Sequence, residues 1–319
     1  MASAAAWKST AAMREAAQKP PSQWSEWDKA NQTDWTNELL HTVGATTLER
    51  YWNAVVRIGQ LSLLASPLAV LVPLSYVYDR PYWEYCLWGI EQAGPTFIKF
   101  VQWATTRQDL FSPAFCQEFG KLRDQTRGHP WKDTERLLKK RGLDTVLELD
   151  RDPIGSGCIA QVYKGTLLQN TGLLPKGTEL AVKVQHPHIL HKVCVDFFVL
   201  GKIASFLETL PYLELRFLSL GDTVQQFCNI MLPQLDLTLE AKHLQRFRKD
   251  FGSDPQVDFP APVEELTNED ILVETFCTGH PILSYGKANE QIRKDLASLG
   301  LQTTLKMIFL HDFVHGDLQ

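Results

Sequence analysis

The sequence that decides the fold lies at residues 155–165, GSGCIAQVYKG, and continues at residues 181–184 with AVKV. Its first three residues, Gly155 to Gly157, fall between two runs of β-forming residues, which predicts a hairpin with a glycine-rich turn. Because glycine has no side chain, such a turn lets the backbone approach a ligand's phosphates and leaves amides free to donate hydrogen bonds. A hairpin turn without a ligand is the alternative that these three residues leave open.

Lys183 belongs to the strand that residues 178–185, TELAVKVQ, predict. Side chains alternate along a strand, so Lys183 lies on the face opposite Val182 and Val184. A lysine in an apolar central strand is unfavourable unless it is paired, and a kinase supplies phosphate oxygens and a helix carboxylate as partners. The glycine turn, Val162 and Lys183 follow one another in the order of the protein-kinase pattern. An edge-strand lysine that points to water is the alternative.

The carboxylate partner of Lys183 is expected on a later helix. Glu240 is the candidate, in the stretch QLDLTLEAKHLQRF at residues 234–247, where leucines give the helix an apolar face. Asp236 lies one turn earlier and is expected on the same side. A solvated acidic helix face is the alternative.

The last helix is expected to run from about Asn289 into His315-Gly316-Asp317. We expect Phe309, Phe313 and Val314 to pack this segment. A carboxylate at Asp317 can orient an attacking hydroxyl group or a metal ion.

Composition limits the classes of partner. The chain has 319 residues, a net charge of −5 and no basic stripe, so no nucleic-acid partner is expected. None of the six cysteines falls in a zinc-binding spacing, which favours reduced and mostly buried thiols.

Four segments follow one another along the chain. Residues 1–45 are polar and are either a targeting segment or disordered. Residues 46–83 are hydrophobic and contain 21 uncharged residues, Ile58–Tyr78, which are either a membrane span or a pair of soluble helices broken at proline. Residues 84–145 show helical periodicity, with one helix opened by Ser112-Pro113 and another over Trp131–Arg141 that stops at Gly142. Residues 146–319 alternate strand and helix signals and include a long helical stretch over about Ser219–Phe251.

With these residues in view, the sequence resembles the UbiB-like atypical kinases, the aarF-domain-containing kinase family, over roughly residues 84–319. Members carry a Lys-x-Gly-Gln motif in a helical extension before the kinase domain, and here Lys99 and Gln102 match it within GPTFIKFVQWATTRQDLF. The resemblance implies that this extension folds over the nucleotide site and restricts access to it. Val101 replaces the motif's glycine, which puts close helix packing at that position in doubt.

The resemblance implies an α+β, atypical protein-kinase-like fold. It would have an N-terminal lobe with an antiparallel sheet plus helices, an N-terminal helical extension, and a C-terminal lobe that is largely missing. It assigns Asp317, Lys183 and Glu240 to catalysis, and Asp236 to the regulatory extension together with Lys99 and Gln102. The residues implied to bind the nucleotide with Lys183 are Gly155, Ser156, Gly157, Cys158 and Ala160.

The implied cofactors are ATP and Mg²⁺, with the metal ligands expected beyond Gln319 and none within the chain. The family also implies a mitochondrial, inner-membrane location, with a plastid as the alternative. Its role would lie in coenzyme Q (ubiquinone) biosynthesis or mitochondrial lipid homeostasis, with membrane lipids or quinone-pathway proteins as partners. By itself the chain is expected to be inactive. Two other functions remain open: a nucleotide-binding pseudokinase scaffold and a membrane-attached lipid-binding helper.

Overall fold

The computed structural model describes residues 35–75, 78–106, 108–109, 111–123, 128–172, 174–210 and 219–316. Asp317 and the predicted targeting segment up to residue 34 lie outside the described residues. The chain divides into two units. The larger unit contains Asp34–His243 and Pro262–Phe276, and the smaller one contains Leu244–Ala261 and Cys277–Gln319 together with the first 33 residues.

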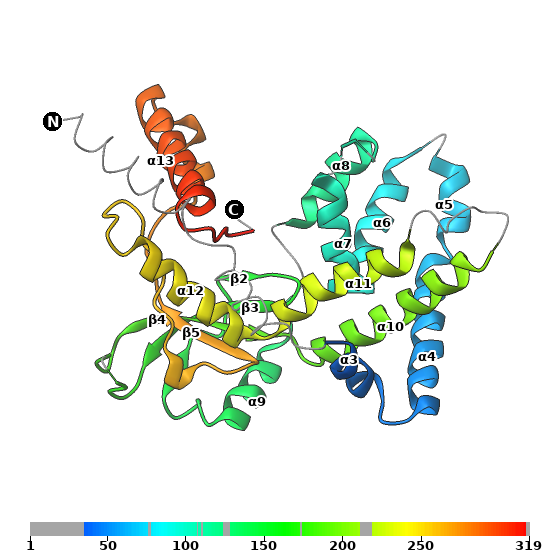
Figure 1. Cartoon of the computed structure of the whole chain (residues 1–319), viewed down its shortest axis with the longest axis horizontal. Helices are drawn as coiled ribbons and strands as arrows, with labels where there is room; N and C mark the ends of the chain where they lie inside the picture. The colour runs from blue at the N-terminus through cyan, green and yellow to red at the C-terminus, as the bar shows by residue number, and fades with distance from the viewer. Residues whose placement is uncertain are drawn as a thin grey trace, which may run out of the picture. The chain divides into compact units, whose positions relative to one another are not determined.

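The larger unit is built on an antiparallel sheet of five strands (Figure 1). The strands run in the order β1-β3-β4-β5, and β2 also pairs with β3. This confirms the strands predicted around the glycine turn and at residues 178–185. The bounds are β1 Leu147–Leu149, β2 Gly155–Ser156, β3 Ala160–Leu167, β4 Glu179–Gln185 and β5 Ile271–Thr275.

One face of the sheet packs on helix α9, Trp131–Arg141. Tyr163, Val182 and Val184 are fully buried in this core together with Leu138 of the helix. The helix ends as predicted, because Gly142 takes up a left-handed conformation (φ 69°) that glycine tolerates best. Because Val182 and Val184 face α9, the opposite face of β4, which carries Lys183, remains available to other groups.

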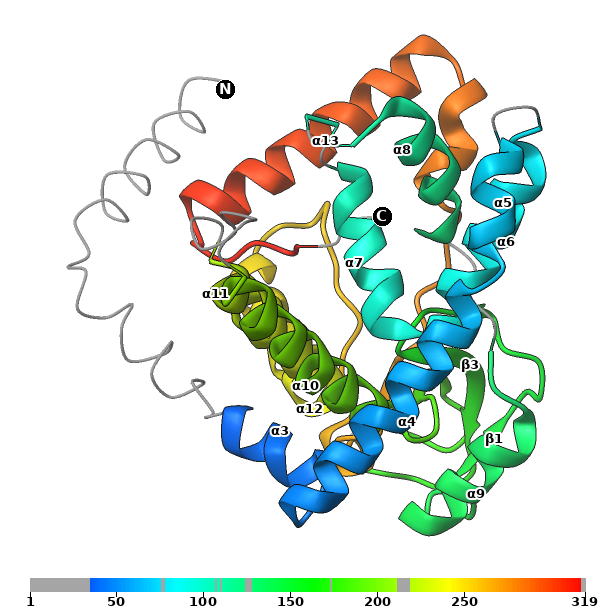
Figure 2. The ribbon, with the colours of Figure 1, turned by 90° about the vertical axis from the view of Figure 1, so that its right-hand side faces the viewer.

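Helices surround the other part of the larger unit. The longest, α10 (Ile189–Glu208), packs against α3, α4 and α11 (Figures 1 and 2). Its apolar side chains, such as Val193 and Phe197, form a second core. The remaining helices of this unit are α3 Trp35–Val43, α4 Thr47–Ala65, α5 Leu68–Ser75, α6 Arg80–Ala93, α7 Pro95–Thr106, α8 Pro113–Phe119, η2 Gly120–Arg123, α11 Leu220–Met231, η4 Leu232–Leu235 and η5 Glu264–Leu266.

The helical stretch predicted over about Ser219–Phe251 is present, but it is divided into three elements. The chain forms α11, then the 3-10 turn η4, and then α12, Leu237–Phe251. Pro233 stands in η4, where it has no amide hydrogen to continue a helix. Asp236 follows in an extended conformation, so it precedes α12 and does not lie one turn before Glu240 within the same helix.

The predicted helical extension, residues 84–145, packs closely at Val101, the position where the family motif has glycine. Val101 is 5% exposed and lies in a small core with Phe119 and Leu122. Gln102 donates from Nε2 to the carbonyl oxygen of Leu122 at 3.1 Å. The doubt raised by the missing glycine is therefore removed, because α8 and η2 provide a pocket that the valine fills.

A buried ion pair joins α4 to α10. Arg57 donates from Nε to Asp196 Oδ1 at 2.6 Å and from Nη2 to Oδ2 at 3.1 Å. Nη2 also donates to the carbonyl oxygen of Ala93, the last residue of α6. Burial raises the pKa of Asp196, and the hydrogen bonds and charge of Arg57 oppose that rise. This pair ties three helices together at one point.

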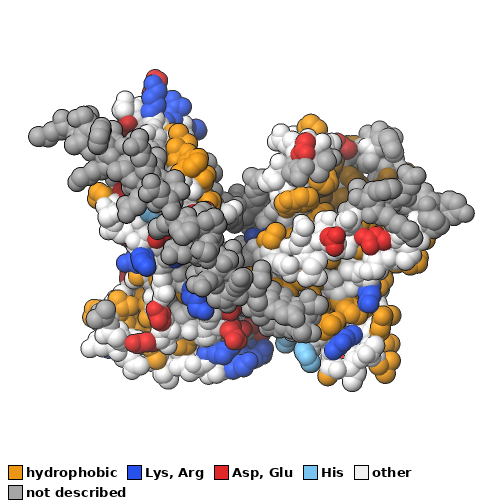
Figure 3. Space-filling view, viewed as in Figure 1, with side chains coloured by type: hydrophobic (Ala, Val, Ile, Leu, Met, Phe, Trp, Pro, Cys, Tyr) orange, Lys and Arg blue, Asp and Glu red, His pale blue; other side chains and the backbone are white. Residues whose placement is uncertain are grey.

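Helices α4 and α5 expose an apolar surface. The stretch Thr47–Ser75 is the one part of the described chain that is long and apolar enough to cross a membrane, by length and composition alone. Only 6% of its most apolar window is buried, so it is not a buried core helix of this unit. Leu63 and Val70 are 76% and 70% exposed, and hydrophobic side chains gather along the edge where α4 lies (Figure 3). Residues 76 and 77 of the predicted Ile58–Tyr78 segment lie outside the described residues.

The smaller unit has its own core. Phe247 and Phe251 of α12 pack with Met307 of α13, Glu290–Phe309, which η6 (Ile282–Lys287) precedes. Of the three side chains expected to pack the segment before Asp317, only Phe313 does so, with its ring 4.6 Å from that of Phe247.

The expectation for the other two side chains is wrong, because Phe309 and Val314 are 62% and 50% exposed. Helix α13 starts with Asn289 as its N-cap, as predicted, but it ends at Phe309, before His315-Gly316.

Candidate functional site

Lys183 and Glu240 form an ion pair in the larger unit. Lys183 Nζ lies 2.8 Å from Oε1 and 2.7 Å from Oε2 of Glu240. Both side chains are half-exposed, at 29% and 40%, so solvent screens part of their attraction. An ammonium group has three hydrogens, and the carboxylate engages two of them. One hydrogen of Lys183 is therefore left for a further acceptor.

Sheet register places Lys183 at this point. Lys183 is opposite Val162 on β3 and opposite Leu272 on β5, so it stands in a central strand. The alternative of an edge-strand lysine is therefore wrong. The neighbours Val182 and Val184 are fully buried on the other face, as the alternation predicts.

The glycine turn lies at the end of the same sheet. Gly155 pairs with Val162, and the Gly157 amide donates to the carbonyl oxygen of Ala160 at 2.9 Å. The expectation that the amides of the turn are free is thus wrong for Gly157, because a tight turn needs this bond. A side-chain carbon at Gly155 would meet no atom within 4 Å, and at Gly157 only the oxygen of Ala160 at 3.6 Å. The backbone of the turn is open to a ligand on that side.

Two histidines hold the glycine turn in place by hydrogen bonds. His186, just after β4, lies with Nε2 2.8 Å from the carbonyl oxygen of Gly157. Its Nδ1 is 2.7 Å from Nδ1 of His129, whose Nε2 is 2.7 Å from the hydroxyl oxygen of Thr134. Burial, followed by the nearby His186, lowers the pKa of His129 to about 4, and burial also lowers the pKa of His186. Both rings are therefore neutral at neutral pH, and they fix the turn as hydrogen-bonding groups.

Cys158 lines a cavity of about 320 Å³, which we call the glycine-turn cavity. Gly157 lines it from the sheet, and Gly94 and Pro95 line it from the junction of α6 and α7. The junction of α6 and α7, in the predicted extension, therefore lies beside the turn, and the restricting role of the extension stays a prediction. Ala160 is buried at the start of β3 and contributes its carbonyl oxygen to the turn.

The three residues assigned to the regulatory extension have different surroundings. Lys99 is half-buried on α7, and Gln102 binds the backbone of η2. Asp236 accepts at Oδ1 from the amide (2.9 Å) and the hydroxyl (2.6 Å) of Thr238, so it closes the first turn of α12. Gln102 and Asp236 thus form hydrogen bonds that stabilise their own helices and turns, and their regulatory role stays a prediction.

Within the described residues, no group of three or more His, Cys, Asp or Glu side chains could hold a metal ion.

Glu274 is a site residue that the sequence reasoning missed. It lies on β5 opposite Ala181 of β4. Because Ala181 precedes Lys183 by two residues, Glu274 and Lys183 are on the same face of the sheet. Burial, and then the charge of Glu240, raises the pKa of Glu274 to about 7, while Lys183 opposes the rise. The signal in the sequence is a lone acid in the apolar strand ILVET, but only the register shows that it faces the ion pair.

The raised pKa of Glu274 predicts a pH-dependent stability. Between pH 4.5 and about 7 the folded chain keeps a proton that the unfolded chain releases, so the free energy of unfolding falls as pH rises through this window. The Glu274→Gln variant removes this loss and is expected to be more stable than the parent above pH 7, by up to about 3 kcal/mol. Urea denaturation at several pH values measures the difference. The Glu148→Gln variant, at an exposed position of β1, is the control and should keep the parent's pH dependence.

An open glycine turn, a central-strand lysine and a helix glutamate paired with it are the parts of the smaller lobe of a protein kinase. This arrangement defines the class. Residues 121–319 match the ABC1 atypical kinase-like domain, and the chain belongs to this family.

Two relatives show the extent of the similarity. The "Probable serine/threonine-protein kinase abkC" of Dictyostelium discoideum is 32% identical over 270 residues, covering 82% of this chain and 38% of the relative. A mitochondrial ABC1 family protein of Schizosaccharomyces pombe is 30% identical over 311 residues, covering 85% of this chain and 45% of the relative. Bacterial proteins named UbiB match as well. The chain spans less than half the length of these relatives.

A solved structure supports the fold. The Rv3197–erythromycin complex from Mycobacterium tuberculosis aligns with a TM-score of 0.50 and 17% identity, over 82% of this chain and 61% of that one. At this identity the comparison concerns the fold alone. The predicted α+β, kinase-like fold with its antiparallel sheet is confirmed.

Proposed function

We propose that this chain forms the nucleotide-binding part of a UbiB-like atypical kinase or ATPase, with ATP as its ligand. The observation that carries the proposal is the ion pair of Lys183 with Glu240, in which Nζ lies 2.8 and 2.7 Å from the two carboxylate oxygens. Lys183 stands on the same sheet as the open glycine turn, and Glu240 reaches it from α12. The third hydrogen of the Lys183 ammonium group is available to a phosphate oxygen. Glu240 keeps that ammonium group in place.

The residues fit a triphosphate. Space above Gly155 lets phosphates approach the backbone, and Lys183 supplies the positive charge that they need. ATP, when bound, supplies the phosphoryl group, and Mg²⁺ would accompany its phosphates. Asp317, which lies outside the described residues, is proposed by resemblance to position the acceptor.

The cellular setting is proposed from the relatives. The name of the Schizosaccharomyces pombe relative places that protein in mitochondria, and we propose the same location for this chain. The exposed apolar surface of α4 and α5 supports attachment to a membrane there. A role in ubiquinone biosynthesis or lipid homeostasis rests on the resemblance to the UbiB family.

Direct binding tests the proposal. A fluorescent ATP analogue is expected to bind the chain saturably in the presence of Mg²⁺, and unlabelled ATP should displace it. AMP should displace it much less well, because Lys183 and the turn act on phosphates that AMP lacks. Absence of saturable binding, or equal displacement by AMP and ATP, would contradict the proposal.

A further inference from the structure

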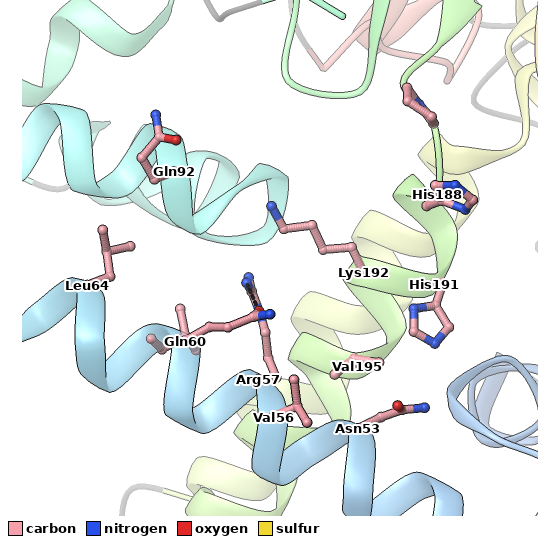
Figure 4. Close-up of a pocket in the computed structure, with 12 residues that line it drawn as sticks. Asn53, Val56, Arg57, Gln60, Leu64, Gln92, His188, His191, Lys192 and Val195 are labelled. Carbon is pink, nitrogen blue, oxygen red and sulfur yellow. Dashed lines mark hydrogen bonds between the residues drawn. The ribbon is translucent and has the colours of Figure 1, made fainter. Parts of the chain in front are cut away.

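A second cavity lies between α4, α6 and α10, away from the Lys183–Glu240 pair. This α4–α10 cavity has a volume of about 490 Å³, within the range of about 300–1,000 Å³ typical of small-molecule sites. Figure 4 shows Arg57 and Gln60 reaching into it from α4 and Lys192 extending from α10 toward α6. None of the described residues that line it is acidic.

Lys192 is the unusual group of the α4–α10 cavity. It is half-buried, yet within the described part of the chain its ammonium group makes no hydrogen bond or ion pair, although its backbone amide donates to His188. Burial, followed by the charge of Arg57, lowers the pKa of Lys192, and Asp196 opposes this only in part. Its ammonium group packs against Gly94 at the end of α6, and burying a lysine without a partner is unfavourable.

The charges around the cavity leave an excess of one cation. Arg57 is neutralised by the fully buried Asp196 behind it. Lys192 has no such partner, and Glu91 lines only the neighbouring glycine-turn cavity, which Lys192 also borders. Helix α10 adds positive potential, because its N-cap, His188, makes no side-chain cap bond and its first amides point toward this end.

The opposite wall is apolar. Leu61 and Leu64 line the cavity from α4, the helix whose outer face exposes further hydrophobic side chains. Tyr85 of α6 fixes this wall, because its hydroxyl donates to the carbonyl oxygen of Leu64 at 2.6 Å. The cavity therefore offers a cation at one end and a hydrocarbon surface at the other.

We propose that the α4–α10 cavity binds a phosphate-bearing ligand with an apolar chain, with the phosphate at Lys192 and the chain along Leu61 and Leu64. A phosphate group accepts the hydrogen bonds that the half-buried ammonium group lacks, and it complements the uncapped end of α10. The ligand is either a soluble phosphate ester or the headgroup of an anionic lipid. Lys192 also borders the glycine-turn cavity, so the two sites adjoin, but Leu61 and Leu64 line only the α4–α10 cavity.

Binding to the chain with defined probes tests the proposal. Hexyl phosphate is expected to bind and to protect Lys192 from amine acylation, followed by peptide mass spectrometry, whereas hexanol should not protect it. Inorganic phosphate should protect more weakly. Vesicles of phosphatidylcholine with and without phosphatidic acid separate the two sources: protection only by phosphatidic acid vesicles assigns the phosphate to a lipid headgroup.

Variants sharpen the test. Lys192→Met should weaken hexyl phosphate binding about tenfold or more and should still fold, because the lysine it replaces has no partner. Lys202→Met, on the same helix but exposed and outside the cavity, is the matched control and should bind as the parent does. Leu64→Asn should weaken hexyl phosphate but not inorganic phosphate. The proposal is overturned if no probe protects Lys192, or if Lys192→Met binds hexyl phosphate as tightly as the parent.

Discussion

Replacing Asp196 by alanine is expected to lower the free energy of unfolding by about 3–5 kcal/mol, the typical effect of leaving one member of a buried ion pair without its partner. The side chain of Asp196 is fully buried and that of Arg57 is 10% exposed. Without the carboxylate, the guanidinium group keeps only the carbonyl oxygen of Ala93 and a long contact to Gln60. Urea denaturation followed by far-UV circular dichroism measures the loss.

Two controls separate charge from packing at this position. The double variant Arg57→Met/Asp196→Leu removes both charges and should recover most of the stability, because a hydrophobic replacement of a buried pair is often neutral. Glu135→Ala breaks an exposed pair with Lys139 on α9 and should leave stability unchanged within error. If Asp196→Ala unfolds at the same urea concentration as the parent, the pair does not hold α4 to α10.

Replacing Lys183 by methionine is expected to weaken ATP binding by about ten- to a hundredfold, the effect of removing one or two charge-assisted hydrogen bonds. Glu240→Gln should weaken it as well, because the amide no longer holds the ammonium group toward a phosphate. Lys183 and Glu240 contact each other directly, so the two substitutions should not be additive. The double variant should bind no worse than Lys183→Met alone. Displacement of a fluorescent ATP analogue gives all three affinities.

The matched control for this cycle is Lys139→Met. Lys139 also pairs with a glutamate, at 2.8 Å, but it lies on the exposed face of α9. Its replacement should leave the affinity for ATP within about twofold of the parent. Additive effects of the Lys183 and Glu240 variants would mean that the two residues act separately, and an unchanged affinity in Lys183→Met would contradict the nucleotide proposal.

Local signals in the sequence were sufficient for much of the fold. Alternation placed Lys183 opposite the buried Val182 and Val184, and Gly142 marked the end of α9 to the residue. Glu240 could be selected because an acid on an amphipathic helix is the usual partner of a strand lysine. The division of the helical stretch at residues 219–251 was not predicted, because helical periodicity continues through Pro233 and the effect of a proline on a helix varies with context.

The remaining contacts depend on tertiary structure. Arg57 and Asp196 are 139 residues apart, and His129 and His186 are 57 apart, so no local pattern connects them. Glu274 reads as an isolated charge until the strand register is known. Taken alone, each of these residues would be expected at the surface in contact with water. Only its burial in the folded structure shows that it has a partner.

The two histidines behind the glycine turn have a further consequence, which concerns where each proton must lie. The Gly157 carbonyl can only accept, so His186 carries its hydrogen on Nε2, and its bare Nδ1 accepts from Nδ1–H of His129. Neutral His129 then has a bare Nε2 that accepts from the Thr134 hydroxyl, which in turn accepts from Tyr163.

Tyr163 receives its own hydrogen bond from the Gln161 amide. All donations therefore run in one direction, from Gln161 near the start of β3 to the turn, and both imidazole tautomers are set by an amide at one end and a carbonyl at the other. A chain of aligned donors of this kind strengthens each of its members, and an added proton would set two donors against each other.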